Sequence, residues 1–196
     1  MLEYKVHNPS QRELFFLAQK GHSMTFLDII TKRYSVRDYA DTPVEEEKLL
    51  KILEAGKWAP SACNIQPCTI IVIRDGATKL KLRPAYNRDW FVSAPVILSV
   101  CVDRLSAWVR SDGVSYGFVD AAIVIDHMVL AATELGLGTC WIGAFKTQEA
   151  KKALRLPENV EPVAFMPLGY PKGQAPKKKR KELEKLVCWE YFDGKK

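Results

Sequence analysis

The segment at residues 116–135 constrains the fold of this chain more than any other feature of the sequence. Ala, Ile, Val, Met and Leu occupy most of its positions, and Gly136, a residue typical of helix ends, follows it. A helix that is apolar on nearly every side has no face suited to solvent. The sequence therefore predicts a helix that is buried either in the centre of the fold or in an interface between subunits.

Shorter helices and strands alternate on both sides of this segment. The spacing of apolar residues predicts a helix at 24–33 and a second helix at 43–56. The start signals of the second helix are Thr42 as N-cap, Pro43 in the first turn and Glu45 completing a capping box. Apolar runs bounded by turn residues predict four strands, at 69–73, 96–102, 139–142 and 162–168. Such alternation is typical of an α/β or α+β sandwich.

The composition fits one compact domain. Of the 196 residues, 47% are hydrophobic and 27% are charged, and a chain of this length can bury a core without a metal or a disulfide. We expect residues 24–196 to form this domain and residues 1–23, which show no sustained apolar period, to be an N-terminal extension outside its core. The longest clean apolar run, at 94–102, is far shorter than the ~20 residues of a membrane span. We therefore expect a cytoplasmic protein that does not enter a membrane.

Cysteine and histidine are too scattered in this sequence for a metal centre. The five cysteines contain no C-x-x-C pair, and the three histidines form no zinc-type spacing with them. His127, in the apolar segment, could act as the base of a cysteine nucleophile, but a helix histidine bonded to a neighbour is the commoner case. We expect reduced thiols, no metal site and no protein-borne nucleophile.

Positive charge gathers in one short stretch of the chain. Residues 171–185 hold seven basic and two acidic side chains and supply most of the net charge of +6, while the remainder is close to neutral. Proteins that bind nucleic acid usually spread basic residues over a whole face. We predict no nucleic-acid partner, and a small RNA-binding or interaction module with a basic tail is the alternative of another class.

Two segments carry side chains suited to binding an anion. Arg33, Ser35 and Arg37 stand at alternate positions, so the two arginines and the hydroxyl share one side of the chain if its backbone is extended. If the backbone is helical, Arg37 still shares a face with Arg33. Guanidinium groups make directional, charge-assisted hydrogen bonds to a phosphate or to a carbonyl edge. The basic run at 177–181 offers further cations.

Two other segments hold small or polar residues that core packing alone does not demand. The loop at 59–67 has Pro60 and Pro67 around small and amide side chains, which is typical of a fixed loop with exposed hydrogen-bonding groups. The segment at 136–144 is rich in glycine, but it follows a helix and its spacing does not match the dinucleotide fingerprint G-x-G-x-x-G. By itself it reads as a helix end followed by a strand.

In this order and spacing, the four segments together resemble the nitroreductase family of FMN-dependent NAD(P)H oxidoreductases. The matching motifs are R-x-S-x-R at 33–37, A-P-S-x-x-N-x-Q-P at 59–67, G-L-G-T-C-W-I-G at 136–143 and R-K-x-L-E at 180–184. The resemblance covers about residues 24–188. It implies an α+β fold, a three-layer α-β-α sandwich of the nitroreductase type, that pairs as an intertwined homodimer with two FMN sites in the interface.

The resemblance also implies which residues surround the FMN. Around the phosphate and ribityl end it places Arg33, Ser35, Lys178 and Arg180. Tyr34, between Arg33 and Ser35, is also expected to bind the cofactor. Beside the pyrimidine edge it places Arg37, whose charge stabilises the negative charge of the reduced ring, and Asn87. Along the ring system, with one backbone N–H facing flavin N5, it places Ile142, Gly143 and Ala144. The residues that would reach the flavin of the partner subunit are Pro60, Ser61, Ala62 and Asn64.

By the same resemblance, the chemistry belongs to the cofactor and no catalytic side chain is expected. NADH or NADPH would give a hydride to flavin N5 and leave, and a small acceptor would then take its place in a ping-pong cycle. The candidate acceptors are nitroaromatics, quinones, enones and free flavin. A flavin-dependent reductive dehalogenase or an enone reductase of the same family is the nearest alternative.

Overall fold

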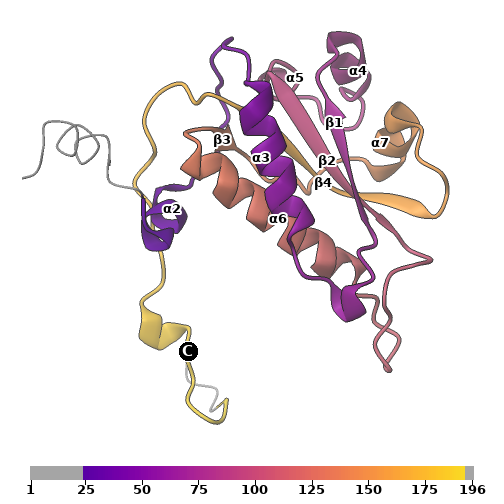
Figure 1. The fold of residues 1–196 in the computed structure, drawn as a ribbon, viewed down its shortest axis with the longest axis vertical. Helices are drawn as coiled ribbons and strands as arrows, with labels where there is room; N and C mark the ends of the chain where they lie inside the picture. Colours follow the sequence, from indigo (N-terminus) through magenta and orange to yellow (C-terminus); the bar gives the residue numbers. More distant parts are fainter. Residues whose placement is uncertain (1–23, 193–196) are drawn as a thin grey trace, which may run out of the picture.

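A four-stranded sheet with helices on both faces forms the body of the molecule (Figure 1). The computed structural model describes residues 24–192, so the extension predicted at 1–23 lies outside the described residues. The strands are β1 (Cys68–Ile73), β2 (Val96–Asp103), β3 (Gly138–Thr139) and β4 (Val160–Gly169). The α-helices are α2 (Phe26–Lys32), α3 (Glu46–Lys57), α4 (Gly76–Lys81), α5 (Asp89–Val92), α6 (Gly117–Glu134) and α7 (Thr147–Leu154). Two short 3₁₀ turns complete the description, η1 (Ala62–Asn64) and η2 (Leu183–Lys185).

The sheet has the order β1-β2-β4-β3, and its neighbouring strands run antiparallel. The long central strands β2 and β4 pair along their whole length, with Leu98 opposite Met166. The strand predicted at 139–142 is shorter than expected, because β3 ends at Thr139. Beyond it, Ile142 makes a single antiparallel bridge to Phe165 of β4.

The two faces of the sheet bury two separate hydrophobic clusters, because successive side chains of a strand point to opposite faces. On one face, Leu98 and Val100 of β2 pack in a cluster with Ile125 and Met128 of α6, beneath α3 and α6. On the other face, a second cluster holds Ile73, Leu82, Phe91, Ile97, Ala150 and Phe165. Figure 1 shows α3 and α6 together on one side of the strands. The predicted three-layer α+β sandwich is confirmed.

The apolar segment forms α6, the longest helix in the described part of the chain, as predicted. Its residues on the sheet side are fully buried, among them Ala121, Ile125 and Met128. Near its first turn, however, Phe118 and Val119 keep 47% and 45% of their surface exposed. One chain therefore covers most of this helix but leaves apolar surface at its N-terminal end.

The predicted start of the helix at 43–56 is wrong by three residues. The helix begins at Glu46, and the predicted capping box does not form, because Glu45 takes the N-cap position without a side-chain cap bond. The Glu45 carboxylate instead accepts a hydrogen bond from the Tyr170 hydroxyl, at 2.7 Å. A partner distant in sequence thus overrides the local start signal. The short helices α4 and α5 were not predicted.

Candidate functional site

The R-x-S-x-R segment lies against the glycine-rich segment. After α2 ends at Lys32, the chain runs extended, and Val36 N donates a hydrogen bond to Thr139 O at 2.9 Å. Ser35 and Thr139 form a parallel bridge. The Val36 side chain is buried, whereas Ser35 and Arg37 are exposed. Two of the four predicted segments therefore meet, and the polar side chains of the first one share the solvent side.

A group of three cations lies next to this junction. Lys178 Nζ donates a hydrogen bond to the carbonyl oxygen of Thr31, which brings the basic tail back to the end of α2. Partial burial and the nearby charges of Arg33 and Arg180 lower the pKa of Lys178. Within residues 24–192, no carboxylate forms a salt bridge with any of these three side chains. Uncompensated cations held together in this way favour an anion such as a phosphate.

Arg37 lies farther along the same extended segment, beside α5. Its guanidinium carbon is 5.9 Å from the centroid of the Trp90 ring, in cation–π geometry. Its charge also acts on the buried Cys140 thiol, whose pKa is raised by burial and partly lowered again by Arg37. Asn87 lies in the exposed loop three residues before Trp90, and its Oδ1 accepts a hydrogen bond from Arg83 at 3.2 Å.

The glycine-rich segment presents backbone rather than side chains to this surface. Ile142 is 4% exposed, and its N–H and C=O are both bonded to Phe165, so its side chain supports the segment from the core. Gly143 and Ala144 are exposed, and their N–H groups have no acceptor in the part of the chain that the structure describes. A Cβ added to Gly143 would meet no atom nearer than Trp141 Nε1, at 3.9 Å. The surface at Gly143 is thus open to a flat ring that accepts a hydrogen bond.

The A-P-S-x-x-N-x-Q-P segment forms a strained loop between α3 and β1. Cys63, Asn64 and Gln66 have φ angles of 51°, 54° and 56°, in the left-handed region that non-glycine residues rarely adopt. Two hydrogen bonds of 2.9 Å hold the loop internally, from Gln66 N to Ser61 Oγ and from Gln66 Nε2 to Asn64 Oδ1. Backbone strain of this kind concentrates at functional sites.

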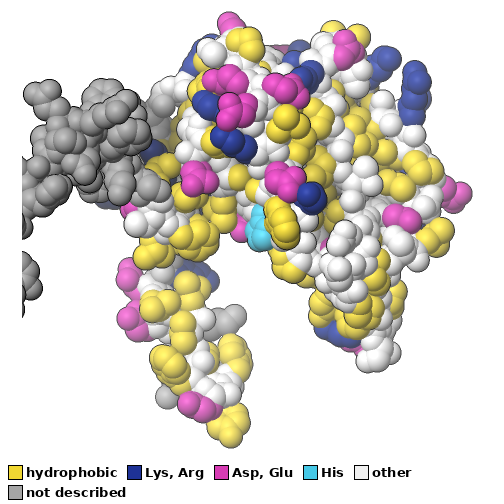
Figure 2. All heavy atoms as spheres, viewed as in Figure 1, with side chains coloured by type: hydrophobic (Ala, Val, Ile, Leu, Met, Phe, Trp, Pro, Cys, Tyr) yellow, Lys and Arg dark blue, Asp and Glu magenta, His cyan; other side chains and the backbone are white. Residues whose placement is uncertain are grey.

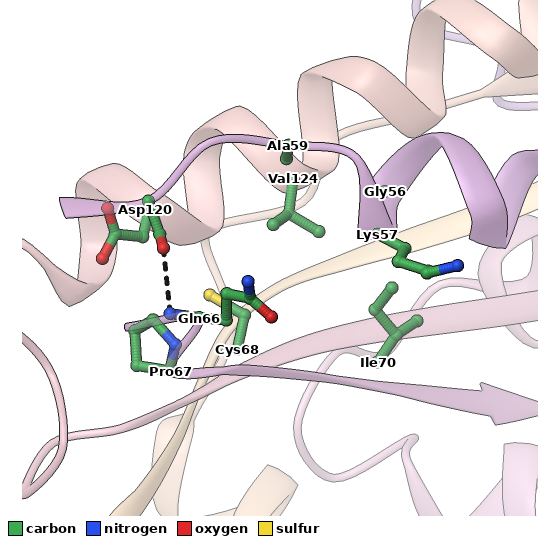
Figure 3. A pocket seen from close by; sticks show the side chains of 10 residues that line it. Gly56, Lys57, Ala59, Gln66, Pro67, Cys68, Ile70, Asp120 and Val124 are labelled. Carbon is green, nitrogen blue, oxygen red and sulfur yellow. Dashed lines mark hydrogen bonds between the residues drawn. The ribbon is translucent and has the colours of Figure 1, made fainter. Parts of the chain in front are cut away.

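A cavity of about 240 Å³ lies behind this loop, between α3, β1 and α6 (Figure 3). It is lined in part by Ser61, Gln66, Cys68 and Asp120. Burial and the negative charge of Asp120 raise the pKa of the Cys68 thiol to about 11. Asp120 was not among the predicted site residues, and the sequence does not single it out, because Asp126 and Glu134 also interrupt the apolar segment.

The strained loop and the cation group lie at opposite ends of α6. Ala62 N donates to Asp120 Oδ1 at 2.9 Å, at the start of this helix. Arg33 and Thr133 line one small pocket at its other end. At about 1.5 Å per residue, Asp120 and Thr133 are about 20 Å apart along the helix. One chain therefore brings Arg33, Lys178 and Arg180 together, but it does not bring the loop residues Pro60, Ser61, Ala62 and Asn64 to them.

Residues 24–192 contain neither a candidate metal site nor a candidate membrane-spanning helix. No group of three or more His, Cys, Asp or Glu side chains in residues 24–192 has the geometry to hold a metal ion. No helix within the same residues is long and apolar enough to cross a membrane. All five cysteines are free thiols.

Comparison with known proteins places the chain in a family. The family model described as "Nitroreductase family" matches residues 30–111 and 83–170. The chain is 35% identical over 168 residues to the FMN reductase (NAD(P)H) of Bacillus subtilis, a match that covers 77% of this chain and 68% of that protein. It is 35% identical over 154 residues to a putative NADH dehydrogenase/NAD(P)H nitroreductase of Archaeoglobus fulgidus, covering 76% of this chain and 86% of the relative.

Solved structures agree with the sequence matches. A crystal structure of a nitroreductase family protein from Clostridium difficile 630 superposes with a TM-score of 0.81 at 36% identity, over 86% of this chain and 100% of that one. A second such protein, from Clostridium novyi NT, gives a TM-score of 0.72 at 34% identity, over 76% of this chain and 86% of that one. The motifs, the fold and these matches lead to one assignment: the chain belongs to the nitroreductase family.

Proposed function

We propose that this protein uses FMN to pass a hydride from NADH or NADPH to a small organic acceptor, at a site that two copies of the chain build together. The enzyme class and the cofactor agree with the names of relatives, FMN reductase (NAD(P)H) and NAD(P)H nitroreductase. The predicted class, an FMN-dependent NAD(P)H oxidoreductase, is thereby confirmed. The residues of the site, the acceptor and the order of steps are the proposal.

The observation that carries the proposed site is the cation group beside an open backbone surface. Arg33, Lys178 and Arg180 supply the positive charge that one terminal phosphate requires. The free N–H groups of Gly143 and Ala144 supply donors for the edge of a ring. The sequence has no glycine-rich motif that would bind the pyrophosphate of FAD. This favours FMN, which has a single terminal phosphate.

When bound, the flavin supplies the hydride-carrying ring, and the protein's residues bind and orient it. Ser35, on the same extended segment as Arg33 and Arg37, offers a hydroxyl to the ribityl chain. Arg37, fixed beside Trp90, places a positive charge where the pyrimidine edge gains negative charge on reduction. Gly143 lets the backbone approach the ring closely because it has no side chain.

Steady-state kinetics test the proposed reaction sequence. A quinone and a nitroaromatic compound would serve as acceptors, each with NADH and with NADPH as donor. Because donor and acceptor occupy the same place in turn, we expect parallel lines in double-reciprocal plots at several acceptor concentrations. Intersecting lines would contradict the ping-pong order. Activity restricted to halogenated aromatics or to enones would favour the reductive dehalogenase or the enone reductase.

No cysteine and no histidine should be needed for the chemistry. We expect Cys63→Ser, Cys68→Ser and His127→Gln to keep NAD(P)H oxidation within about tenfold of the wild type, which corresponds to about 1.4 kcal/mol of barrier. The thiol of Cys68 is protonated at neutral pH, since its pKa is raised to about 11. A ~10³-fold loss in any of these variants would instead indicate protein-borne catalysis.

Exposed apolar surface supports the pairing of two chains. The segment that ends the described chain extends away from the body (Figure 1), and hydrophobic side chains cover much of it (Figure 2). Leu183, Leu186 and Trp189 keep 62% or more of their surface exposed there. Phe118 and Val119 add apolar surface at the start of α6. A second copy of the chain would cover such surfaces. The strained loop of that copy would lie beside the cation group of the first chain, and the two together would form one FMN site.

Mixed dimers test whether the site is shared between two chains. One variant, Arg33→Ala with Arg180→Ala, damages the cation half, and the other, Asn64→Ala, damages the loop half. If the halves come from different chains, unfolding and refolding the two variants together restores one intact site in each mixed dimer. We expect FMN binding that neither variant shows alone, and light scattering at twice the chain mass of 22.2 kDa. A monomer, or a mixture that binds no more FMN than its parts, would contradict the shared site.

The alternative of another class is a module that binds RNA through its basic tail. The position of Lys178 against α2, beside Arg33, favours a local role in anion binding over a free tail. A mobility-shift assay with RNA at physiological salt separates the two, because contacts to nucleic-acid phosphates are strongly salt-dependent. The absence of a nucleic-acid partner and the cytoplasmic location stay predictions.

A further inference from the structure

We infer that Asp120 is a positioning residue, which holds the strained loop at residues 60–66 in the conformation that meets the FMN. This inference rests on the proposed function, which assigns that loop to the flavin of the partner subunit. Asp120 lies in the first turn of α6 and is 2% exposed. Its Oδ1 accepts a hydrogen bond from Ala62 N at 2.9 Å. It thus connects the middle of the loop to the most buried helix of the fold.

The loop needs a hydrogen bond to another element because the hydrogen bonds within the loop do not fix its position relative to the rest of the fold. Gln66 N to Ser61 Oγ and Asn64 N to Ser61 O are bonds within the loop. Among the described residues, hydrogen bonds tie residues 60–66 to another element only at Ala62. Left-handed backbone at Cys63, Asn64 and Gln66 costs free energy, so it persists only where the surroundings over-determine it.

Packing does not replace this hydrogen bond on the inner side of the loop. The cavity of about 240 Å³ lies between the loop and the helices, and Ser61, Gln66 and Asp120 all border it (Figure 3). A loop backed by a cavity has few van der Waals contacts to restrain it there. Among the described residues, the bond from Ala62 N to the Asp120 carboxylate is the hydrogen bond that connects the centre of the loop to another element.

The cost of burying Asp120 also indicates a role other than stability. Its Oδ2 is buried and has no hydrogen-bond partner within residues 24–192. A buried carboxylate with one oxygen unsatisfied destabilises a fold relative to an apolar residue. A carboxylate is nevertheless a stronger acceptor for a backbone N–H than a neutral group. The buried Asp120 carboxylate thus lowers the stability of the fold but holds the loop through a strong hydrogen bond.

Three variants test the inference by FMN affinity. Asp120→Ala removes the acceptor of Ala62 N, Asp120→Asn keeps an oxygen acceptor, and Asp126→Ala is the matched control, an exposed aspartate of the same helix. Since a loop that is only partly in its binding conformation weakens the apparent affinity by that fraction, we expect Asp120→Ala to raise the Kd for FMN by about 10 to 100-fold. Asp120→Asn should stay within about fivefold, and Asp126→Ala should not differ from the wild type. A merely structural role would lower the melting temperature of Asp120→Ala but leave the FMN affinity of the folded protein unchanged.

Hydrogen exchange of the flavin-free protein gives a second measurement that does not depend on activity. In the wild type, the amide of Ala62 should exchange at least about tenfold more slowly than that of Cys63, since it is bonded to Asp120. In Asp120→Asn this protection should decrease, while the amides of α3 keep theirs. Equal exchange at Ala62 and Cys63, or unchanged FMN affinity in Asp120→Ala, would overturn the inference. A wild type that binds no FMN would instead refute the proposed function.

Discussion

We expect Gly143→Leu to weaken FMN binding strongly while the chain still folds. A Cβ at this position meets no atom nearer than 3.9 Å, and Gly143 is exposed, so we expect the flavin-free protein to tolerate a side chain there. It would, however, fill the open surface to which the ring is assigned and would shield the N–H groups of Gly143 and Ala144. We expect the Kd for FMN to rise by at least about 100-fold, a loss of about 2.7 kcal/mol or more. Fluorescence titration of the apoprotein measures the FMN affinity, and the melting temperature of the apoprotein shows whether the variant still folds.

Gly138→Ala is the comparison for stability, not for FMN binding. Its Cβ would lie 2.5 Å from Cγ2 of the buried Val36, in the short strand β3. Overpacking of this kind costs about 1 to 3 kcal/mol, so Gly138→Ala should lower the melting temperature clearly. If Gly143→Leu binds FMN like the wild type, the ring does not lie on the Gly143 surface.

Removing both arginines of the cation group should weaken FMN binding by about 10³-fold. A charge-assisted hydrogen bond contributes about 1.5 to 3 kcal/mol, so Arg180→Ala alone should raise the Kd by about 10 to 100-fold. Arg33→Ala adds a comparable loss, reduced by coupling because Arg33 and Arg180 both act on Lys178. Lys178→Ala should lose less than Arg180→Ala, since an ammonium group lacks the bidentate geometry of a guanidinium.

Lys177→Ala is the control for net charge, because it removes one positive charge from the exposed part of the same basic run. Its Kd should stay within about twofold of the wild type. If Lys177→Ala and Arg180→Ala lower the affinity equally, the basic run acts only through its summed charge. If Arg180→Ala binds FMN normally and the chain binds RNA in a salt-sensitive way, the binding-module alternative is correct.

Much of the fold could be predicted because local patterns and tertiary packing agree. The apolar segment became α6, and the strands expected at 69–73, 96–102 and 162–168 became β1, β2 and β4 with small changes at their ends. The start of α3 could not be predicted, since Tyr170 takes the carboxylate of Glu45 across 125 positions of the chain. The short helices α4 and α5 carry too few residues to show a helical period.

Sequence patterns can indicate parts of the candidate site whose residues lie close together along the chain. The alternation of Arg33, Ser35 and Arg37 was compatible with an extended or a helical backbone, and the structure has the extended one, with Ser35 and Arg37 exposed. The place of Ile142 along the ring stays a prediction: its side chain is in the core, and its backbone forms a bridge to Phe165. Asp120 could not be assigned from sequence, since its role depends on a contact with Ala62, 58 residues earlier.

The flavin content of the purified protein tests the central claim most directly. The measurement is heat release of the bound chromophore, its identification by chromatography, and its quantity per chain, followed by anaerobic titration of the intact protein with NADH and with NADPH. We expect FMN at about one per chain, with the absorbance of the oxidised flavin bleached by at least one of the two donors. A colourless protein that takes up no added FMN, or one that carries FAD, would contradict it.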